Sequence, residues 1–240
     1  MSGHSKWATI HRKKGLIDAA RGKVFQKLAK ELYVAAKSGT PDPDQNAALR
    51  MVVEKAKAAN MPKDNIQKAI DKAKGAGANE HYDQIRYEGY GPSGVAVMVD
   101  CLTDNKNRTA SFVRSTFTKK GGNLGTDGSV SYMFERKGSI VIPSTYDEDE
   151  IMLTALDNGA IDFENDGENY CITTSAEDML KVKESLEGVG VENFLESEVT
   201  FIPNMEIEVT DEEQKEKVLE LIEQLEDIDD VQSVYFNMKD

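Results

Sequence analysis

The chain has 240 residues, among which 43 Asp and Glu outnumber 29 Lys and Arg and give a formal net charge of −14. Hydrophobic residues make up 39% of the chain, enough for two or three small cores in a soluble protein. No apolar run approaches the ~18 residues of a membrane span, and the first fifteen residues lack the apolar stretch of a secretory signal. We therefore expect a cytoplasmic protein without a membrane partner.

The first eighty residues predict a small helical domain. Apolar residues recur near every 3.6 positions over residues 16–37, and Gly39 with the prolines after it ends that helix. Asp44 is the expected N-cap of a second helix, and the "NMPKD" turn leads into a third helix that ends at Gly75. The stretch "GAGANE" is expected to connect this domain, residues 1–78, to the rest of the chain.

After residue 80, β-rich and helical stretches alternate. "QIRYEGYG" and "VAVMVDCL", joined by "GPSG", predict a hairpin, and a helix follows over residues 106–120. The later expected elements are strands in "GSVSYMFE" and "GSIVIP", a helix in "DEDEIMLTALDNG", a strand in "NYCITT", a helix in "SAEDMLKVKESLEGVG" with a capping box at Ser175 and Asp178, strands in "SEVTFIP" and "MEIEV", a helix from about Asp211 to Glu226, and a strand in "VQSVYFNM".

This alternation contains no run of equal parallel units, so it favours a multi-domain α+β fold over a doubly wound sheet. The terminal β-α-β segment needs more strands to cover its helix, and the hairpin with its helix needs the same. We expect these two segments to pair as one discontinuous α+β domain, residues 79–134 plus 204–240. An acidic α+β domain, residues 135–203, is then inserted between its two halves.

The sequence lacks the residue patterns of common catalytic and metal sites. Cys101 and Cys171 have neither CxxC spacing nor a neighbouring histidine, and His4 and His11 have no third ligand beside them. The acidic runs lack the spacing of an EF-hand loop, and no Walker motif is present. We expect no enzymatic activity, no cofactor and no metal.

The charge is divided unevenly along the chain. Residues 1–80 hold 16 Lys and Arg against 8 Asp and Glu, a net charge of +8, while residues 81–240 carry −22. Such a division predicts a polyanionic partner for the N-terminal part. An acidic surface kept only for solubility is the alternative explanation for residues 140–240.

The strongest binding signal is the basic stretch "GHSKWATIHRKKG" together with the helix after it. Lys23, Lys27 and Lys30 follow at spacings of four and three, so they share one helix face that can track phosphates. Trp7 can either stack on a base or anchor the stretch in the core. The candidate nucleic-acid-binding residues of this region are His4, Ser5, Lys6, Trp7, His11, Arg12, Lys13, Lys14, Arg21, Lys23 and Lys27.

Two further candidates lie in the acidic part of the chain. A helix N-terminus suits phosphate, and "TDNKNRTASFVRS" presents cationic and amide side chains there; ordinary capping by Asp104 or Asn105 is the alternative. The glycine-rich "KKGGNLGTDGS" allows a close approach to phosphate, or it simply caps the helix and turns the chain. The candidate residues of both stretches are Lys106, Asn107, Arg108, Arg114, Lys119, Lys120 and Asn123.

Several motifs resemble the YebC/PmpR family of probable transcriptional regulatory proteins, whose relatives include the mitochondrial translational activator of cytochrome c oxidase. The motifs are "GHSKW", "HRKKG", "NMPKDNI", "YEGYGPSGVAV" and "DNKNRT…GGNLG…GSVSYMF", in this order over the chain. The resemblance implies a helical N-terminal domain and two α+β (ferredoxin-like) domains, the last inserted in the middle one. It also implies DNA-binding transcriptional regulation, or help to ribosomes at proline-rich stretches, without enzymatic activity.

The residues leave three functions open. The second and third helices could form a helix-turn-helix that offers Asn65, Gln67, Lys68 and Lys72 to DNA, but their turn lacks glycine. Backbone-directed binding suits ribosomal or transfer RNA equally, which makes a ribosome-associated translation factor the second hypothesis. An adaptor whose acidic domains hold basic proteins is the third. No dimer face is evident, so we expect a monomer or a weak dimer.

Overall fold

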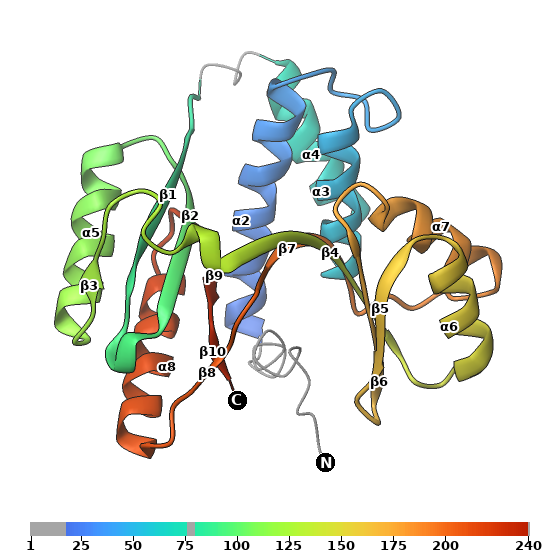
Figure 1. Ribbon diagram of the computed structural model, residues 1–240. Helices are drawn as coiled ribbons and strands as arrows, with labels where there is room; N and C mark the ends of the chain where they lie inside the picture. The colour runs from blue at the N-terminus through green and yellow to red at the C-terminus, as the bar shows by residue number, and fades with distance from the viewer. Residues whose placement is uncertain (1–17, 76–79, 240) are drawn as a thin grey trace. The chain divides into compact units, whose positions relative to one another are not determined.

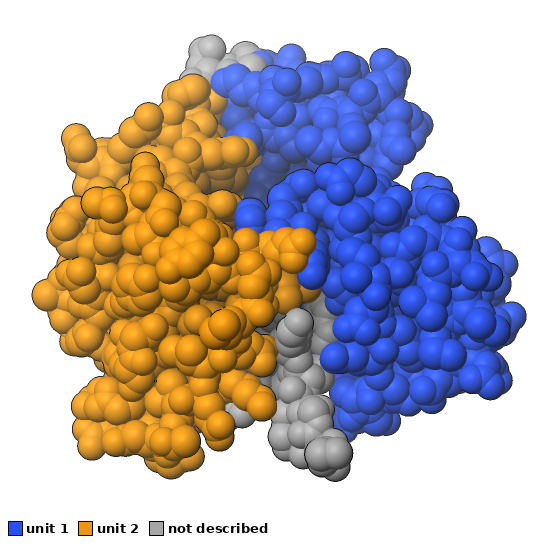
Figure 2. Space-filling view, viewed as in Figure 1, with its two compact units in different colours: residues 1–12, 31–78, 136–201 blue, residues 13–30, 79–135, 202–240 orange. Residues whose placement is uncertain are grey.

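A computed structural model describes residues 18–75 and 80–239 of the chain, with side chains of the first helix from residue 22 onward. The chain divides into two compact units (Figure 2). Unit 1 comprises residues 1–12, 31–78 and 136–201, and unit 2 comprises residues 13–30, 79–135 and 202–240. No helix within the described residues is long and apolar enough to cross a membrane.

Three helices form the described N-terminal region: α2 (Asp18–Lys37), α3 (Ala47–Ala58) and α4 (Lys63–Lys74). They confirm the predicted helical region, but the N-cap of α3 is Asn46 rather than Asp44. The buried Asn46 side chain accepts a hydrogen bond from the Leu49 amide and donates one to the Ala35 carbonyl oxygen, both near 3 Å. This one amide therefore caps α3 and also ties it to the end of α2, which a surface aspartate could not do.

Unit 2 contains a four-stranded sheet in the order β3-β1-β2-β9 (Figure 1). Strand β1 pairs with β2 as the predicted antiparallel hairpin, and β9 pairs antiparallel with the other edge of β2. Helices α5 and α8 bury apolar side chains such as Val113 and Leu221 against Val97 and Val99 of β2. The bounds are β1 (Asp83–Tyr90), β2 (Ala96–Thr103), α5 (Lys106–Lys119), β3 (Asn123–Leu124), β8 (Ile207–Glu208), α8 (Glu212–Glu226), β9 (Val231–Phe236) and β10 (Met238–Lys239).

Unit 1 contains a second four-stranded sheet, in the order β5-β6-β4-β7, with α6 and α7 packed on it through a core that includes Ile140, Ile172 and Leu186 (Figure 1). The predicted α+β class is therefore confirmed, while the predicted domain boundaries stay a prediction. The bounds are β4 (Phe134–Pro143), α6 (Glu148–Asp157), β5 (Ala160–Asn165), β6 (Asn169–Ser175), α7 (Met179–Gly188) and β7 (Glu196–Pro203).

Two details of the second sheet differ from expectation. "GSVSYMFE" and "GSIVIP" were expected as two strands, but residues 131–133 form a short 3-10 turn and β4 runs unbroken from Phe134 to Pro143. Strand β5 was not expected at all, because its sequence "AIDFEN" mixes apolar and acidic residues around a bulge. The predicted pairing of Ser175 with Asp178 is present: the Asp178 amide donates to the Ser175 hydroxyl, which donates to the Asp178 carboxylate.

Within unit 1, a buried lysine joins α3 to α7. Lys183 is 8% exposed, its Nζ lies 2.9 Å from a Glu54 carboxylate oxygen, and it also pairs with Glu187. The same ammonium lies 4.7 Å from the centre of the Phe194 ring. Burial lowers the pKa of Lys183, but its bonds to Glu187 and Glu54 outweigh burial and raise the pKa overall, so the charge is retained.

We expect the substitution Lys183→Met to lower the free energy of unfolding by about 2–4 kcal/mol, because it removes one partner of a buried ion pair while Lys57 still contacts Glu54. A urea titration measures this change. The matched control is Lys181→Met on the same helix, where the side chain is exposed and a change within about 0.5 kcal/mol is expected. Equal losses in both variants would contradict a role for this ion pair in joining the helices.

Candidate nucleic-acid interface

The basic N-terminal stretch lies outside the described residues. This applies to His4, Ser5, Lys6, Trp7, His11, Arg12, Lys13 and Lys14. The backbone of Arg21 belongs to α2, but its side chain is also outside the described part. These candidates therefore stay predictions from the sequence.

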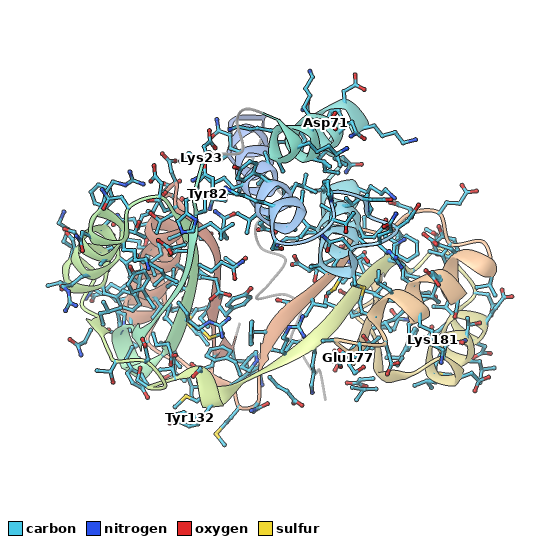
Figure 3. The ribbon with its side chains drawn as sticks, turned by 90° about the horizontal axis from the view of Figure 1, so that it is seen from above. Lys23, Asp71, Tyr82, Tyr132, Glu177 and Lys181 are labelled. Carbon is cyan, nitrogen blue, oxygen red and sulfur yellow. The ribbon has the colours of Figure 1, made fainter. Side chains whose placement is uncertain are left out.

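The lysines of α2 contact the C-terminal end of α8 instead of forming an unpaired stripe. The Nζ atom of Lys23 lies 2.7 Å from an Asp227 carboxylate oxygen, and that of Lys27 donates to the Glu226 carbonyl oxygen at 2.8 Å. Lys30 completes the row by donating to the carbonyl oxygen of Asp229 at 2.9 Å. Figure 3 labels Lys23 on α2.

This arrangement gives Lys23 and Lys27 a role within the fold, and their assignment to a phosphate-binding face stays a prediction. The last carbonyl groups of a helix have no partners within the helix and carry the negative end of its dipole, so they favour cations. Lys27 supplies such a cation to the last carbonyl of α8, while Lys23 pairs with the C-cap Asp227 and Lys30 bonds Asp229 just beyond the helix. Their spacing on α2 is explained by contacts within the protein.

The cationic side chains at the N-terminal end of α5 are also paired with carboxylates. Asn105 caps the helix by accepting from the Arg108 amide, which confirms ordinary capping as the role of this residue. The Arg108 guanidinium bonds Asp104 and Asp230, each at 2.7 Å, and the Lys106 ammonium lies 3.1 Å from Asp83. Lys106 and Arg108 therefore do not present uncompensated charge at this end of the helix.

Asp230 is the central acceptor of this cluster. Its side chain is 7% exposed and accepts from Arg108 and from the Thr109 hydroxyl, with Lys30 at 3.5 Å. Burial raises the pKa of Asp230, but the bonds from Arg108 and Thr109 outweigh burial and lower it overall. The ionised carboxylate therefore joins α2, α5 and the start of β9, and sequence analysis did not identify it because its partners are distant in the chain.

The glycine-rich loop after α5 ends the helix and then turns the chain. The Gly122 amide donates to the Phe117 carbonyl oxygen at 2.8 Å, and Gly121 has a φ of +77°. Lys120 is paired with Glu220 at 2.6 Å, and Asn123 is exposed in the edge strand β3. These contacts support the capping explanation over a phosphate-binding role.

A buried carboxylate holds the far end of the same loop. Glu88 is 5% exposed and accepts from the amides of Gly128, Val130 and Ser131 at 2.8–3.0 Å. Burial opposes the ionisation of Glu88, but these backbone hydrogen bonds outweigh it and lower the pKa overall. The loop amides thus point inward to Glu88 and are not available to an external phosphate.

The outer face of α5 is different because its cations have no partners among the described residues. Arg114 and Lys119 are both exposed, and α5 contains no acidic residue. Phe112 is 52% exposed on the same helix, and Asn107 is exposed near its start.

The pair α3 and α4 has the chain geometry of a helix-turn-helix but limited capacity to read bases. Four residues separate the helices, and Asn60 adopts a φ of +59° in this turn, which supplies the left-handed residue that the missing glycine seemed to exclude. The Gln67 side chain donates to Asp71, which lies on the outer side of α4 (Figure 3), and Lys72 lies over the Tyr33 ring. Lys68 is exposed.

The described residues contain no group of three or more His, Cys, Asp or Glu arranged to hold a metal ion. The candidate surfaces left in the described part of the chain are therefore the outer faces of α4 and α5. Both carry exposed lysine or arginine.

Comparison with known protein families decides the family of the chain. Residues 5–76 match the N-terminal domain of the TACO1/YebC protein, and residues 82–238 match the second and third domains of TACO1/YebC. This chain belongs to the TACO1/YebC family. The predicted resemblance is confirmed, and the two matches together span nearly the whole sequence.

Relatives of high similarity share the name "probable transcriptional regulatory protein". One from Geobacillus thermodenitrificans is 55% identical, covering 99% of this chain and 97% of the relative. One from Lactobacillus acidophilus is 54% identical, covering 98% and 97%. A crystal structure of a conserved hypothetical protein from Aquifex aeolicus is 47% identical, has a TM-score of 0.85 and covers 98% of this chain and 97% of its own. The names of these relatives thus state a regulatory role and do not mention an enzymatic activity.

The contact of α2 with α8 predicts a pH-dependent stability. Burial, reinforced by the neighbouring Lys23, lowers the pKa of Lys27 from 10.5 to about 8. Between these two values the unfolded chain binds more protons than the folded chain, so the folded chain becomes relatively more stable as the pH rises. From pH 8 to pH 10, we expect the wild type to gain about 1–3 kcal/mol relative to Lys27→Met, measured by urea titration.

Lys217→Met on α8 is the control. Its hydrogen bond to Glu213 raises the pKa of Lys217 above 10.5, so this lysine stays largely protonated in both states over that pH range. The difference in unfolding free energy between wild type and Lys217→Met is expected to stay flat. A flat profile for Lys27→Met as well would show that its ammonium is not desolvated.

Proposed function

We propose that this protein is a nucleic-acid-binding regulator of gene expression that acts through contacts to the phosphate backbone. The shared name of its relatives, probable transcriptional regulatory protein, supports a role on DNA. The observation that carries the proposal is the local excess of positive charge near the start of an otherwise acidic sequence. Residues 3–15 contain Lys6, Arg12, Lys13 and Lys14 and no Asp or Glu.

An acidic protein binds a polyanion only where cations are locally in excess, because its net charge of −14 repels phosphate elsewhere. Residues 3–15 meet this condition by sequence, and α5 adds the exposed cations Arg114 and Lys119 without an acidic residue of its own. Each such cation releases counterions when it contacts a phosphate, which gives salt-dependent binding without strong sequence preference.

The side chains of α4 favour a second candidate function, an RNA-binding translation factor on the ribosome. A DNA reader needs unengaged amides for base edges. Here the Gln67 amide donates to Asp71 at 2.9 Å, and Asn65 is half-buried. Phosphate contacts with weak sequence preference suit structured RNA at least as well as an operator.

We expect the double substitution Lys13→Glu with Lys14→Glu to weaken nucleic-acid binding and to flatten its salt dependence. Each lost phosphate contact lowers the slope of log K against log salt by roughly 0.7 to 0.9. Fluorescence anisotropy over a salt series measures this slope. The matched control, Lys215→Glu with Lys217→Glu on acidic α8, changes the net charge equally and should leave the slope unchanged. If both double variants lower the slope equally, the N-terminal contact is refuted.

The two candidate targets are separated by parallel measurements on the wild type. A transcriptional regulator should prefer its promoter over scrambled duplex by at least ~10³-fold at physiological salt. A translation factor should bind both duplexes alike and sediment with ribosomes in a sucrose gradient. Crosslinking in cells, followed by sequencing of the bound DNA and RNA, identifies the targets in each case. Absence of bound nucleic acid in every experiment would overturn the proposal.

A further inference from the structure

We infer that the acidic end of α8, residues 226–230, is an internal competitor of nucleic acid. It holds the lysine row of α2, which is Lys23, Lys27 and Lys30, in a closed state, and a phosphate backbone must displace it to reach these lysines. This inference rests on the proposed function and adds a regulation to it, because the lysine row joins the interface only when its contact with α8 opens.

The first argument is the position of the acidic residues. Residues 226–230 read "EDIDD", four acids in five positions, at the C-terminal end of α8. This end carries the negative end of the helix dipole, which disfavours acidic side chains, and the last turn of α8 contains no basic residue to offset them. The cations that lie against this end come from α2 instead. The acids are therefore unfavourable for α8 itself and are explained by the contact with α2.

The second argument is the likeness of this contact to a phosphate contact. Spacings of four and three place the three lysines on one narrow face of α2. That face meets a row of oxygen acceptors, namely the Asp227 carboxylate and the carbonyl oxygens of Glu226 and Asp229, at 2.7–2.9 Å. A row of oxygens with a high density of negative charge is also what a nucleic-acid backbone presents. The two surfaces therefore compete for the same ammonium groups.

The third argument is that the closed contact is weakly held. The side chains of Lys23 and Asp227 are 50% and 65% exposed, and ion pairs with such exposure contribute little to stability. Burial lowers the pKa of Lys27, so its place in the contact disfavours the ammonium form. Exchange of these partners for phosphate therefore sacrifices little stability.

The acceptor of Lys30 does not depend on this lysine. Asp230 lies 3.5 Å from Lys30 but also accepts from Arg108 and Thr109, at 2.7 and 2.8 Å. Departure of the lysine therefore leaves this buried carboxylate with two donors, and no uncompensated charge is created.

The apolar anchor of α2 lies on the other side of the helix. Leu28, Leu32 and Ala36 are buried and follow one another at spacings of four. At about 100° per residue, this row lies roughly opposite the lysine row. The lysines can therefore exchange partners while the apolar side chains stay in the core.

A zero-length carbodiimide crosslink on the full-length wild type follows the closed contact directly. The reagent joins Lys23 to Asp227 because their charged atoms lie 2.7 Å apart, and peptide mass spectrometry measures the yield. A saturating 20-base-pair duplex of mixed sequence with hydroxyl ends, tested as DNA and as RNA, should lower this yield severalfold. The matched control is the pair Lys120 and Glu220 in the same unit, 2.6 Å apart, whose yield should not change.

Removal of the competing charge should favour the duplex. Asp227→Asn with Asp229→Asn is expected to raise the affinity roughly 2- to 5-fold beyond its control, the factor that about one exposed ion pair supplies. The control is Glu216→Gln with Glu223→Gln, which removes the same charge from exposed positions of α8. Fluorescence anisotropy measures both affinities.

Removal of the lysines should reduce the number of phosphate contacts. Lys23→Gln with Lys30→Gln is expected to lower the slope of log K against log salt by roughly 1.4 to 1.8, at 0.7 to 0.9 per contact. Lys215→Gln with Lys217→Gln on α8 removes the same charge and should leave the slope unchanged. The crosslink on the wild type decides the question if a lysine variant loses stability.

The outcomes separate this inference from the proposed function. A Lys23–Asp227 crosslink that persists at saturating duplex overturns the inference, and so does an equal loss of the Lys120–Glu220 control. If Lys13→Glu with Lys14→Glu still weakens binding in that case, the proposed function stands without this regulation. A wild type that binds neither duplex and no ribosome overturns both.

Discussion

The contact between the lysines of α2 and the C-terminal end of α8 is the interaction on which the rest of unit 2 depends. It joins residues about 200 positions apart, and Lys27 satisfies the terminal Glu226 carbonyl group, which α8 cannot satisfy itself. Lys27 is desolvated in this contact, and the resulting lowering of its pKa opposes the protonated form. The lysines of α2, which the sequence suggested as part of a binding surface, therefore make contacts within the fold.

Asp230 extends this arrangement to α5. The same carboxylate that lies 3.5 Å from Lys30 accepts from Arg108 and Thr109, so the start of α5 is oriented by the group that receives α2. Burying a carboxylate is unfavourable unless it is paired and hydrogen-bonded, and here three donors surround it. The segment after α8 is thus tied to both helices by shared acceptors in addition to the apolar core.

Much of the fold could be predicted from the sequence because local rules govern it. Apolar periodicity located α2, α5 and α8 within a few residues, and "GPSG" marked the hairpin between β1 and β2. The errors have long-range causes. Asn46 displaced Asp44 as the cap because only Asn46 also reaches α2, and the expected strand "GSIVIP" is the part of the longer strand β4 that pairs with β6.

The candidate site was less predictable than the fold, since a sequence shows charges but not their partners. Lys106 and Arg108 have the composition of a phosphate site, yet Asp83, Asp104 and Asp230 neutralise them. Asp230 in particular gave no signal in the sequence, because its partners Lys30, Arg108 and Thr109 are more than a hundred positions away.

The distribution of cations along this acidic chain also constrains how a polyanion approaches the protein. At physiological salt, charges act over about 8 Å, so an acidic surface repels phosphate only near contact and distant lysines cannot compensate for it. Residues 3–15, with four cations and no acid, can attract the ligand without this opposition.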